Sequence, residues 1–349
     1  MEKKKKIKNR VIFIISVILI TAFLLLLQRL LVPKYVDGIV EGAFIEEYYR
    51  EDKDFNVVFL GDCEVYENFS TVKLWDDYGI NSYIRGSAEQ YIWQSYYLLE
   101  DTLYYEKPDV VVFNIQSLQF SESQNEAYNR MSIEGMRWSP AKVGSILASM
   151  KEGEHFIEYV FPILRYHTRW SELTGDDFKY MFRKKPVTFN GYYMRVDVKP
   201  AENIPNPRPL GDYSFGDNAW KYLDKIVEKC DREGVELLLI KAPSLYPYWY
   251  PEWDEQVVKY AEEHGLRYIN FLDHTDEIGI DYSKDTYDAG LHMNLSGAEK
   301  CSAYIGRILR DEFGVESRRG EEKLEKAWDA ERAAYNAEIE RQTEVYGLK

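Results

Sequence analysis

The sequence predicts an α/β protein built on a doubly wound, five-stranded parallel sheet. Short apolar runs rich in β-branched and aromatic residues recur along the chain, and helix-like stretches separate them. Such runs suit strands that are buried on both faces, and their alternation with helices favours parallel crossover connections. The strands are expected at residues 55–60, 82–85, 110–115, 235–240 and 268–272.

The helices are predicted from apolar periodicity and from residues that end helices. Gly79, Gly234 and Gly265 each follow a helix-like stretch, where glycine commonly forms the carboxyl cap. Between residues 117 and 215 the alternation of strand and helix is lost, so this region is predicted to be a mostly helical insertion. Helices are expected over 67–78, 90–106, 136–150, 154–172, 176–182, 217–232, 254–264 and 294–313.

The amino-terminal residues predict a membrane anchor. Residues 1–10 carry six basic groups and one acidic group, and residues 11–31 are apolar apart from a Gln-Arg pair and single small polar residues. This length approaches the roughly 20 residues that cross a bilayer, and no small-x-small cleavage site follows it. The basic stub is therefore expected to stay in the cytoplasm, with everything after about Pro33 outside a single-pass anchor. A long signal peptide is the alternative.

The rest of the chain is acidic. The formal net charge is −15, and without residues 1–10 it falls to about −20, a charge that repels nucleic acid. Residues 34–54 are predicted to be a polar connector, and residues 55–315 the α/β domain. Residues 316–349 form a charged helix whose stripe is expected to dock on the domain, a surface-lying or partner-binding helix being the alternative. The stripe consists of Leu324, Trp328, Tyr335 and Ile339.

One cysteine differs from the other two. The three cysteines are odd in number and widely spaced, which does not indicate a disulfide framework. Cys230 and Cys301 fall in expected helices, whereas Cys63 follows the first strand in the run Gly-Asp-Cys. In open α/β sheets the loops at the carboxyl ends of strands bind ligands, so Cys63 is expected to face a cleft.

A histidine and a carboxylate complete a constellation suited to acyl transfer. Asp288 and His292 lie in the polar loop that precedes the last helix of the domain. A histidine removes the proton of a nucleophile and later returns one to the leaving group, while a carboxylate fixes the tautomer of the imidazole. Cys63, His292 and Asp288 are therefore the predicted catalytic residues.

These motifs resemble those of the SGNH (GDSL-type) hydrolase and acyltransferase superfamily, over residues 55–115 and 217–312. Gly-Asp-Cys at 61–63 looks like the family's Gly-Asp-Ser block, and residues 285–300 look like membrane-anchored members in Firmicutes. The resemblance implies an SGNH or flavodoxin-like sheet. It also implies that Gly86 and Asn114 donate hydrogen bonds to the oxyanion, as the second- and third-block residues do.

Three departures separate the chain from this family. The nucleophile is a cysteine instead of a serine, and a thiol needs a nearby histidine or helix amino terminus to supply thiolate. Asp288 precedes His292 by four residues instead of three, an extra residue that a bulged loop around Gly290 can absorb. The third block lacks its glycine and aspartate. The side chains of Gln116, Asn125 and Asn129 therefore compete with Asn114.

Four further residues are candidates for substrate binding. Asp62 lies next to Cys63, although capping of the following helix is its alternative role. Lys241 ends a predicted strand, where it either points into the cleft or is solvated. Tyr248 and Trp249 belong to an aromatic run at 246–253 that either stacks on sugar rings or packs as a loop.

The resemblance implies an extracytoplasmic, membrane-tethered acyl esterase or O-acyltransferase acting on a cell-envelope glycan. Its partners would be an acylated glycan or an acyl donor, and a membrane protein that exports acyl groups is a candidate partner. No cofactor or metal is implied, because no His, Cys and Asp cluster has ligand spacing. The alternatives are a catalytically lapsed module that binds glycan or a partner in an envelope complex, and a structural membrane protein organised by its last helix.

Overall fold

The computed structural model describes residues 2–32, 44–52, 54–182, 186–202, 204 and 206–348. The chain divides into two compact units. The smaller unit comprises Met1–Val40 and Glu152–Lys185, and the larger comprises Glu41–Lys151 and Pro186–Lys349. The larger unit carries the sheet and every residue that the sequence singles out for chemistry.

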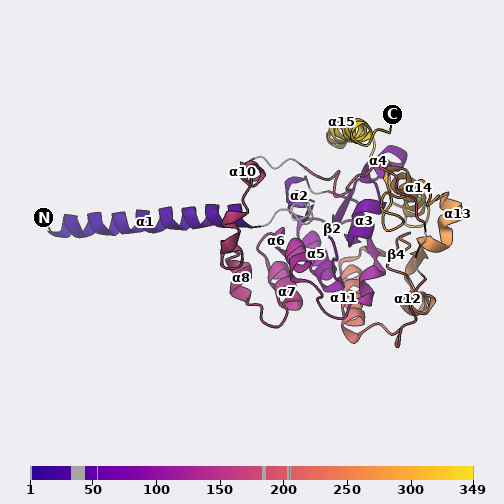
Figure 1. The fold of residues 1–349 in the computed structure, drawn as a ribbon, viewed down its shortest axis with the longest axis horizontal. Coiled ribbons are helices and arrows are strands. Elements are labelled where there is room, and N and C mark those ends of the chain that lie inside the picture. Colours follow the sequence, from indigo (N-terminus) through magenta and orange to yellow (C-terminus); the bar gives the residue numbers. More distant parts are fainter. Residues whose placement is uncertain are drawn as a thin grey trace. The chain divides into compact units, whose positions relative to one another are not determined.

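The larger unit is built on a five-stranded sheet in which all strands are parallel, as predicted (Figure 1). The order is β2-β1-β3-β4-β5, so the chain leaves β1 toward one edge and returns to β3 on its other side. Sheets wound in this way have a topological switch point between β1 and β3, where ligands commonly bind. The strands are β1 (Val57–Gly61), β2 (Ser82–Gly86), β3 (Val110–Asn114), β4 (Glu236–Lys241) and β5 (Arg267–Asn270).

Helices cover both faces of this sheet. On one face, side chains of α5 (Ile92–Tyr105), α11 (Asp217–Glu233) and α12 (Pro251–His264) join those of Val58 and Leu60 in one buried cluster. Side chains alternate along a strand, so Phe59 points to the opposite face. There its ring packs on Phe69, between α3 (Cys63–Asn68) and α4 (Thr71–Tyr78), on the side where α14 (Leu295–Asp311) contacts both helices.

Three of the predicted helices differ in the structure: two are interrupted and one begins later than expected. The helix expected over 67–78 is two helices, α3 and α4, because the Ser70 hydroxyl accepts a hydrogen bond from Lys73 N and starts α4 anew. The helix expected over 136–150 begins only at Pro140, after α6 (Glu126–Glu134), as α7 (Pro140–Ser149). The helix expected over 154–172 is broken at Pro162 into α8 (Phe156–Val160), α9 (Ile163–Tyr166) and the 3₁₀ helix η4 (His167–Ser171). Capping and proline positions, which end helices locally, decided these boundaries.

The remaining helices follow the expected positions closely. The glycines that were expected to end α4, α11 and α12 all have left-handed backbone conformations. Between β3 and β4 the described residues form helices and loops with a single isolated bridge between Phe189 and Tyr192. The short elements are η3 (Ile115–Gln119), α10 (Gly175–Phe182), η5 (Phe271–His274) and α13 (Thr275–Ile278).

The last helix, α15 (Glu322–Val345), packs against the rest of the larger unit through Trp328 and Tyr335, the two buried members of the predicted stripe. The Trp328 ring stacks on Trp75 of α4 with centroids 5.3 Å apart, and its indole N–H donates to Asn81 Oδ1 at 3.0 Å. Tyr335 is buried, and its hydroxyl donates to Glu299 Oε1 at 3.0 Å. The helix therefore completes the cover over α4.

The smaller unit contains one helix that is long and apolar enough to cross a membrane. This helix is α1 (Glu2–Leu31), and its candidate span is Lys4–Leu31. Of the connector expected at 34–54, residues 34–43 and 53 lie outside the described residues. The described part forms α2 (Phe44–Glu47) and η2 (Tyr48–Arg50), which bury Phe44 and Tyr48 in the larger unit.

Candidate active site

Cys63 is the first residue of α3 and follows the carboxyl end of β1, beside the topological switch point. Gly61, which ends β1, has φ of 156°, a conformation that L side chains rarely adopt. A Cβ at this position would lie 2.3 Å from Val65 Cγ2 and 2.9 Å from Asn114 Cβ. Glycine at position 61 therefore allows α3 to turn back against β3 and sets where the thiol stands.

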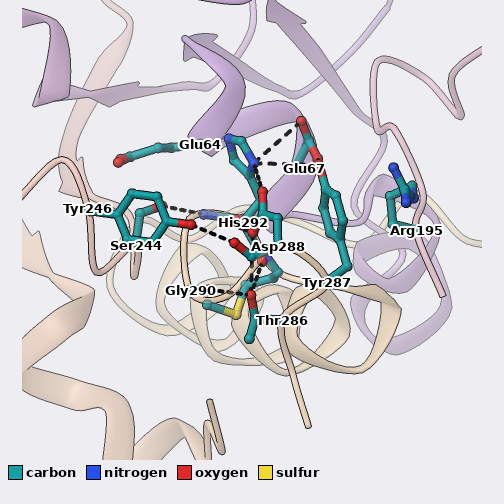
Figure 2. Close-up of polar contacts among 12 residues, drawn as sticks. Glu64, Glu67, Arg195, Ser244, Tyr246, Thr286, Tyr287, Asp288, Gly290 and His292 are labelled. Carbon is teal, nitrogen blue, oxygen red and sulfur yellow. Dashed lines mark hydrogen bonds and ion pairs between the residues drawn. The ribbon is translucent and has the colours of Figure 1, made fainter. Parts of the chain in front are cut away.

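Asp288 and His292 form a tight pair in the loop before α14 (Figure 2). Asp288 Oδ2 lies 2.7 Å from His292 Nδ1, and Asp288 Oδ1 accepts the backbone N–H of His292 at 2.8 Å. The additional residue between them is accommodated by left-handed conformations at Ala289 (φ 70°) and Gly290 (φ 103°). The Thr286 hydroxyl accepts Gly290 N–H and donates to the His292 carbonyl, both at 2.8 Å, which fixes the bulge.

A second carboxylate reaches the same imidazole. Glu67 is buried on α3, and its Oε1 lies 3.8 Å from His292 Nδ1. Its other oxygen accepts a hydrogen bond from the Tyr287 hydroxyl, and the Tyr287 ring lies nearly parallel to the His292 ring at 6.0 Å (Figure 2). The Arg195 guanidinium sits 4.3 Å above the Tyr287 ring centre. The His292 ring therefore lies beside the carboxylates of Asp288 and Glu67 and the ring of Tyr287.

The thiol of Cys63 lies close enough to His292 for each group to change the pKa of the other. His292 Nδ1 is occupied by Asp288, whereas the buried Nε2 has no hydrogen-bond partner in the described part of the chain. Nε2 is therefore the nitrogen left for the thiol. The arrangement matches a nucleophile, a base and a carboxylate that orients the base.

The surroundings of Cys63 favour its protonated, uncharged thiol. Although Cys63 is only partly buried, burial is the main influence that raises the pKa of its thiol to about 12, against the opposing effect of His292. Burial alone would lower the pKa of His292, but the Glu67 carboxylate leads the influences that raise this pKa well above its usual value. Both shifts favour the protonated form of their group, and a protonated His292 must lose a proton before it can act as a base. Activated cysteines usually show the opposite shift.

Gly86 lies at the end of β2, in register with Gly61 at the end of β1. A Cβ on Gly86 would lie 3.1 Å from the carbonyl oxygen of Gly61 and 3.3 Å from that of Asp62. The backbone at Gly86 therefore approaches the Cys63 loop more closely than a residue with a side chain would allow.

Asn114 ends β3 at the same edge, but its amide is already engaged. Nδ2 donates to Asp62 Oδ1 at 3.2 Å and to Glu64 Oε2 at 3.0 Å, and Oδ1 accepts Ala242 N–H at 3.1 Å. Both amide hydrogens are thus directed at buried carboxylates. Asn114 ties β1, β3 and β4 together beneath the Cys63 loop.

The other side chains considered as oxyanion donors differ in whether their amide groups already have hydrogen-bond partners. The Asn125 side chain caps α6 by accepting Ala127 N–H, and Asn129 donates to the Ser149 carbonyl. Gln116 is buried two residues beyond β3, and neither its Nε2 nor its Oε1 has a partner within the described residues. Of these side chains, Gln116 has an uncommitted amide.

Lys241 and Asp62 do not line an open cleft. They belong to a buried network of hydrogen bonds and an ion pair. Lys241 is fully buried and pairs with Glu64 Oε2 at 2.9 Å. Asp62 caps α3 by accepting Glu64 N–H at 3.2 Å, and burial together with the neighbouring Glu64 raises its pKa. This network supports the loop that carries the thiol.

The aromatic run divides into buried and exposed members. Trp249 is buried, packs 5.4 Å from Trp253 and donates to Asp254 Oδ1, so it belongs to the core. Tyr248 is 39% exposed. Tyr246 is the member that contacts the site, because its hydroxyl donates to the Asp288 carbonyl at 2.5 Å (Figure 2).

Sequence reasoning missed Glu67, Tyr287 and Tyr246. Glu67 carried a usable signal, since it follows Cys63 by four residues and helical periodicity places such residues on one face. Tyr287 was marked only by its position beside Asp288. Nothing in the local pattern distinguished Tyr246 from the other tyrosines of its run.

No protein-family model matches the chain, and no curated protein matches it either. Among the described residues, no group of three or more His, Cys, Asp or Glu side chains is arranged to hold a metal ion. The fold and the site together define the class: a parallel α/β protein with a Cys-His-Asp cluster at the carboxyl edge of its sheet. Its activity is inferred below from that cluster.

Proposed function

We propose that the protein is a membrane-tethered acyl esterase or O-acyltransferase of the SGNH type that acts on a cell-envelope glycan. Cys63 is the nucleophile, His292 the base and then the acid, and Asp288 the residue that orients His292. One observation carries this proposal. Asp288 holds His292 Nδ1 at 2.7 Å and leaves the buried Nε2 unpaired, with the Cys63 thiol within electrostatic reach of the ring.

The reaction follows from these positions. Cys63 Sγ attacks the ester carbonyl carbon, and the thiol proton passes to neutral His292 Nε2. The carbon–oxygen bond of the ester then breaks, and His292 gives its proton to the departing alcohol, leaving a thioester on Cys63. Water, or a glycan hydroxyl in a transferase, attacks the thioester, loses a proton to His292 and regenerates the thiol.

The oxyanion formed in both steps needs donors at the Cys63 loop. The backbone N–H groups of Cys63 and Gly86 are proposed for this role, supported by the close approach of Gly86 to the loop. Asn114 would have to release Asp62 or Glu64 before it could contribute. The free amide of Gln116 makes it the alternative side-chain donor.

The proposed location and substrate rest on other observations. The α1 helix supports a membrane anchor, and the basic residues before it favour a cytoplasmic amino end with the larger unit outside. The envelope glycan and an acyl-exporting partner come from the resemblance to SGNH proteins. The exposed Tyr248 is a candidate surface for a sugar ring.

The proposal is tested by trapping the thioester. Full-length protein in detergent is mixed with an activated aryl ester, and the mass of the intact protein is followed. We expect one acyl adduct on Cys63, no adduct in Cys63→Ala, and acylation about 10²–10⁴-fold slower in His292→Ala, the usual contribution of a general base. His274→Gln is the matched control, because His274 is a partly exposed histidine that pairs with Glu277 instead of the site residues, and it should acylate at the rate of the original protein.

The second candidate function is a binding module that has lost catalysis. Two observations favour it: the raised pKa of the Cys63 thiol and the committed amide of Asn114. Absence of any adduct between neutral pH and pH 10, combined with retained binding of envelope glycan, would establish this function and exclude the enzyme.

A further inference from the structure

Residues 152–182 of the smaller unit, here called the interfacial segment, expose large apolar side chains. Trp170 is 71% exposed and Phe182 is 78% exposed. Monomeric soluble proteins rarely display clustered apolar groups of this size without a partner. The full set is Ile157, Phe161, Leu164, Trp170, Phe178 and Phe182.

The exposed side chains follow the helical period. Phe178 and Phe182 are four residues apart on α10, and Ile157 and Phe161 have the same spacing at α8. Helical residues with this spacing share a face. The inward positions between them, such as Tyr159 and Tyr180, are buried. The segment is therefore amphipathic, with its apolar side turned outward.

The segment is fastened to the carboxyl end of α1. Arg169 Nη1 lies 3.3–3.5 Å from the carbonyl oxygens of Leu30, Leu31 and Val32, and Nη2 forms an ion pair with Asp177 Oδ1 at 2.6 Å. The last carbonyls of a helix lack intrahelical partners, and a cation at this end is electrostatically favourable. Figure 1 shows the α8–α10 stretch running across the end of α1 instead of continuing its axis.

The end of α1 fixes the depth of the segment. Residues 11–31 span about 32 Å at roughly 1.5 Å per residue, close to the roughly 30 Å thickness of the hydrocarbon core of a bilayer. The carbonyls that bind Arg169 thus lie at the boundary between hydrocarbon and headgroups. Tryptophan and other amphipathic or apolar side chains on helices lying in this plane are stabilised there.

We propose that the interfacial segment lies on the bilayer at the carboxyl end of α1 and inserts its exposed side chains among the lipids. Its elements α9, η4 and α10 pack against α1, whose own apolar side chains are exposed, which is why lipid is the occupant that fits it. This inference rests on α1 spanning a membrane, as proposed above, and is independent of the chemistry at Cys63.

Quenching of tryptophan fluorescence by brominated lipids tests the inference. Full-length protein is reconstituted into phosphatidylcholine–phosphatidylglycerol vesicles whose bromine atoms lie near either the ester end or the methyl end of the acyl chain. The sequence of α1 contains no tryptophan, and Trp138, another exposed tryptophan, is replaced by Phe in every protein compared. Trp170→Phe in this background isolates the Trp170 signal, and its high exposure makes the substitution harmless to folding.

We expect quenching that is stronger for bromine near the ester end and that is lost in Trp170→Phe. Lipid quenching that is the same with and without Trp170 would overturn the inference. So would self-association in detergent that Phe178→Glu or Phe182→Glu abolishes, because the apolar face would then bind a second copy. Failure of the protein to float with vesicles would refute the membrane anchor as well, whereas flotation without Trp170 quenching would refute the segment alone.

Discussion

Two glutamates on one short helix have different partners. Glu64 and Glu67 are both buried on α3 and stand on either side of the site, Glu64 against Lys241 and Glu67 against His292. Lys241 Nζ donates to both carboxylate oxygens of Glu64, at 3.1 and 2.9 Å, so Glu64 forms a fixed structural pair. The pKa of the His292 imidazole is instead raised, and Glu67 is the leading influence that raises it. The comparison shows that a buried carboxylate shifts the pKa of its partner when that partner is a titratable histidine.

The largest effect is expected from breaking the fixed pair. In Lys241→Met the Glu64 carboxylate stays buried without its cation and keeps the Asn114 amide, and we expect a loss of about 3–5 kcal/mol in the free energy of unfolding. Thermal or urea unfolding of the full-length protein in detergent measures this loss. The double variant Lys241→Met with Glu64→Gln should recover part of it. Equal destabilisation in single and double variants would contradict an electrostatic origin.

The rate of Cys63 alkylation tests the raised pKa of its thiol and the influence of Glu67 on it. A pKa of about 12 leaves about 10³-fold less thiolate at neutral pH than the ordinary value of 9.0, so labelling by iodoacetamide should be slower than that of a free thiol by about this factor. The rate should rise with pH up to about pH 12. Because the Glu67 charge is one of the influences that raise this pKa, Glu67→Gln should label faster. Rapid labelling of the original protein at pH 7 would contradict the shift.

The same shift predicts how stability depends on pH. The folded pKa of Cys63 lies above its unfolded value, so its contribution to stability is complete below about pH 9 and is lost as the pH rises toward 12. His292 also has a raised folded pKa. Its contribution is complete below the unfolded value of 6.5 and disappears as the pH passes through the folded value.

The smallest expected effect is a shift in a pH profile. Removing the Glu67 charge in Glu67→Gln lowers the pKa of His292, because Glu67 is the leading influence that raises it. Acylation of Cys63 requires neutral His292, so the midpoint of the acylation rate against pH should move to lower pH. Glu122→Gln, a change of the same kind at an exposed position, should leave the midpoint unmoved. An unchanged midpoint in Glu67→Gln would show that Glu67 does not raise the pKa of His292.

The sheet was predictable because strands buried on both faces have continuous apolar runs in the sequence. Runs such as residues 110–113 are apolar throughout, and each of the five predicted strands is present within a few residues. Helix boundaries were less predictable. A serine cap at Ser70 and prolines at 140 and 162 overrode the apolar periodicity that predicted continuous helices.

The candidate site was predictable where the residues lie in loops at strand ends. Cys63, Asp288 and His292 come together because strand ends share one edge of the sheet, whatever the details of packing. Lys241 and Trp249 show the limit. A strand-end lysine and a loop tryptophan look alike in sequence whether they face solvent or the interior, and only the tertiary partners Glu64 and Trp253 decide.

The docking of α15 has a consequence for biosynthesis. Trp75 and Trp328 stack although more than two hundred residues separate them in sequence, and Ser70 and Tyr335 are linked across a similar separation. Contacts this distant in sequence slow folding, because a long loop must close before they form. The nascent domain therefore leaves the Trp75 ring of α4 without its stacking partner until Trp328 has been synthesised.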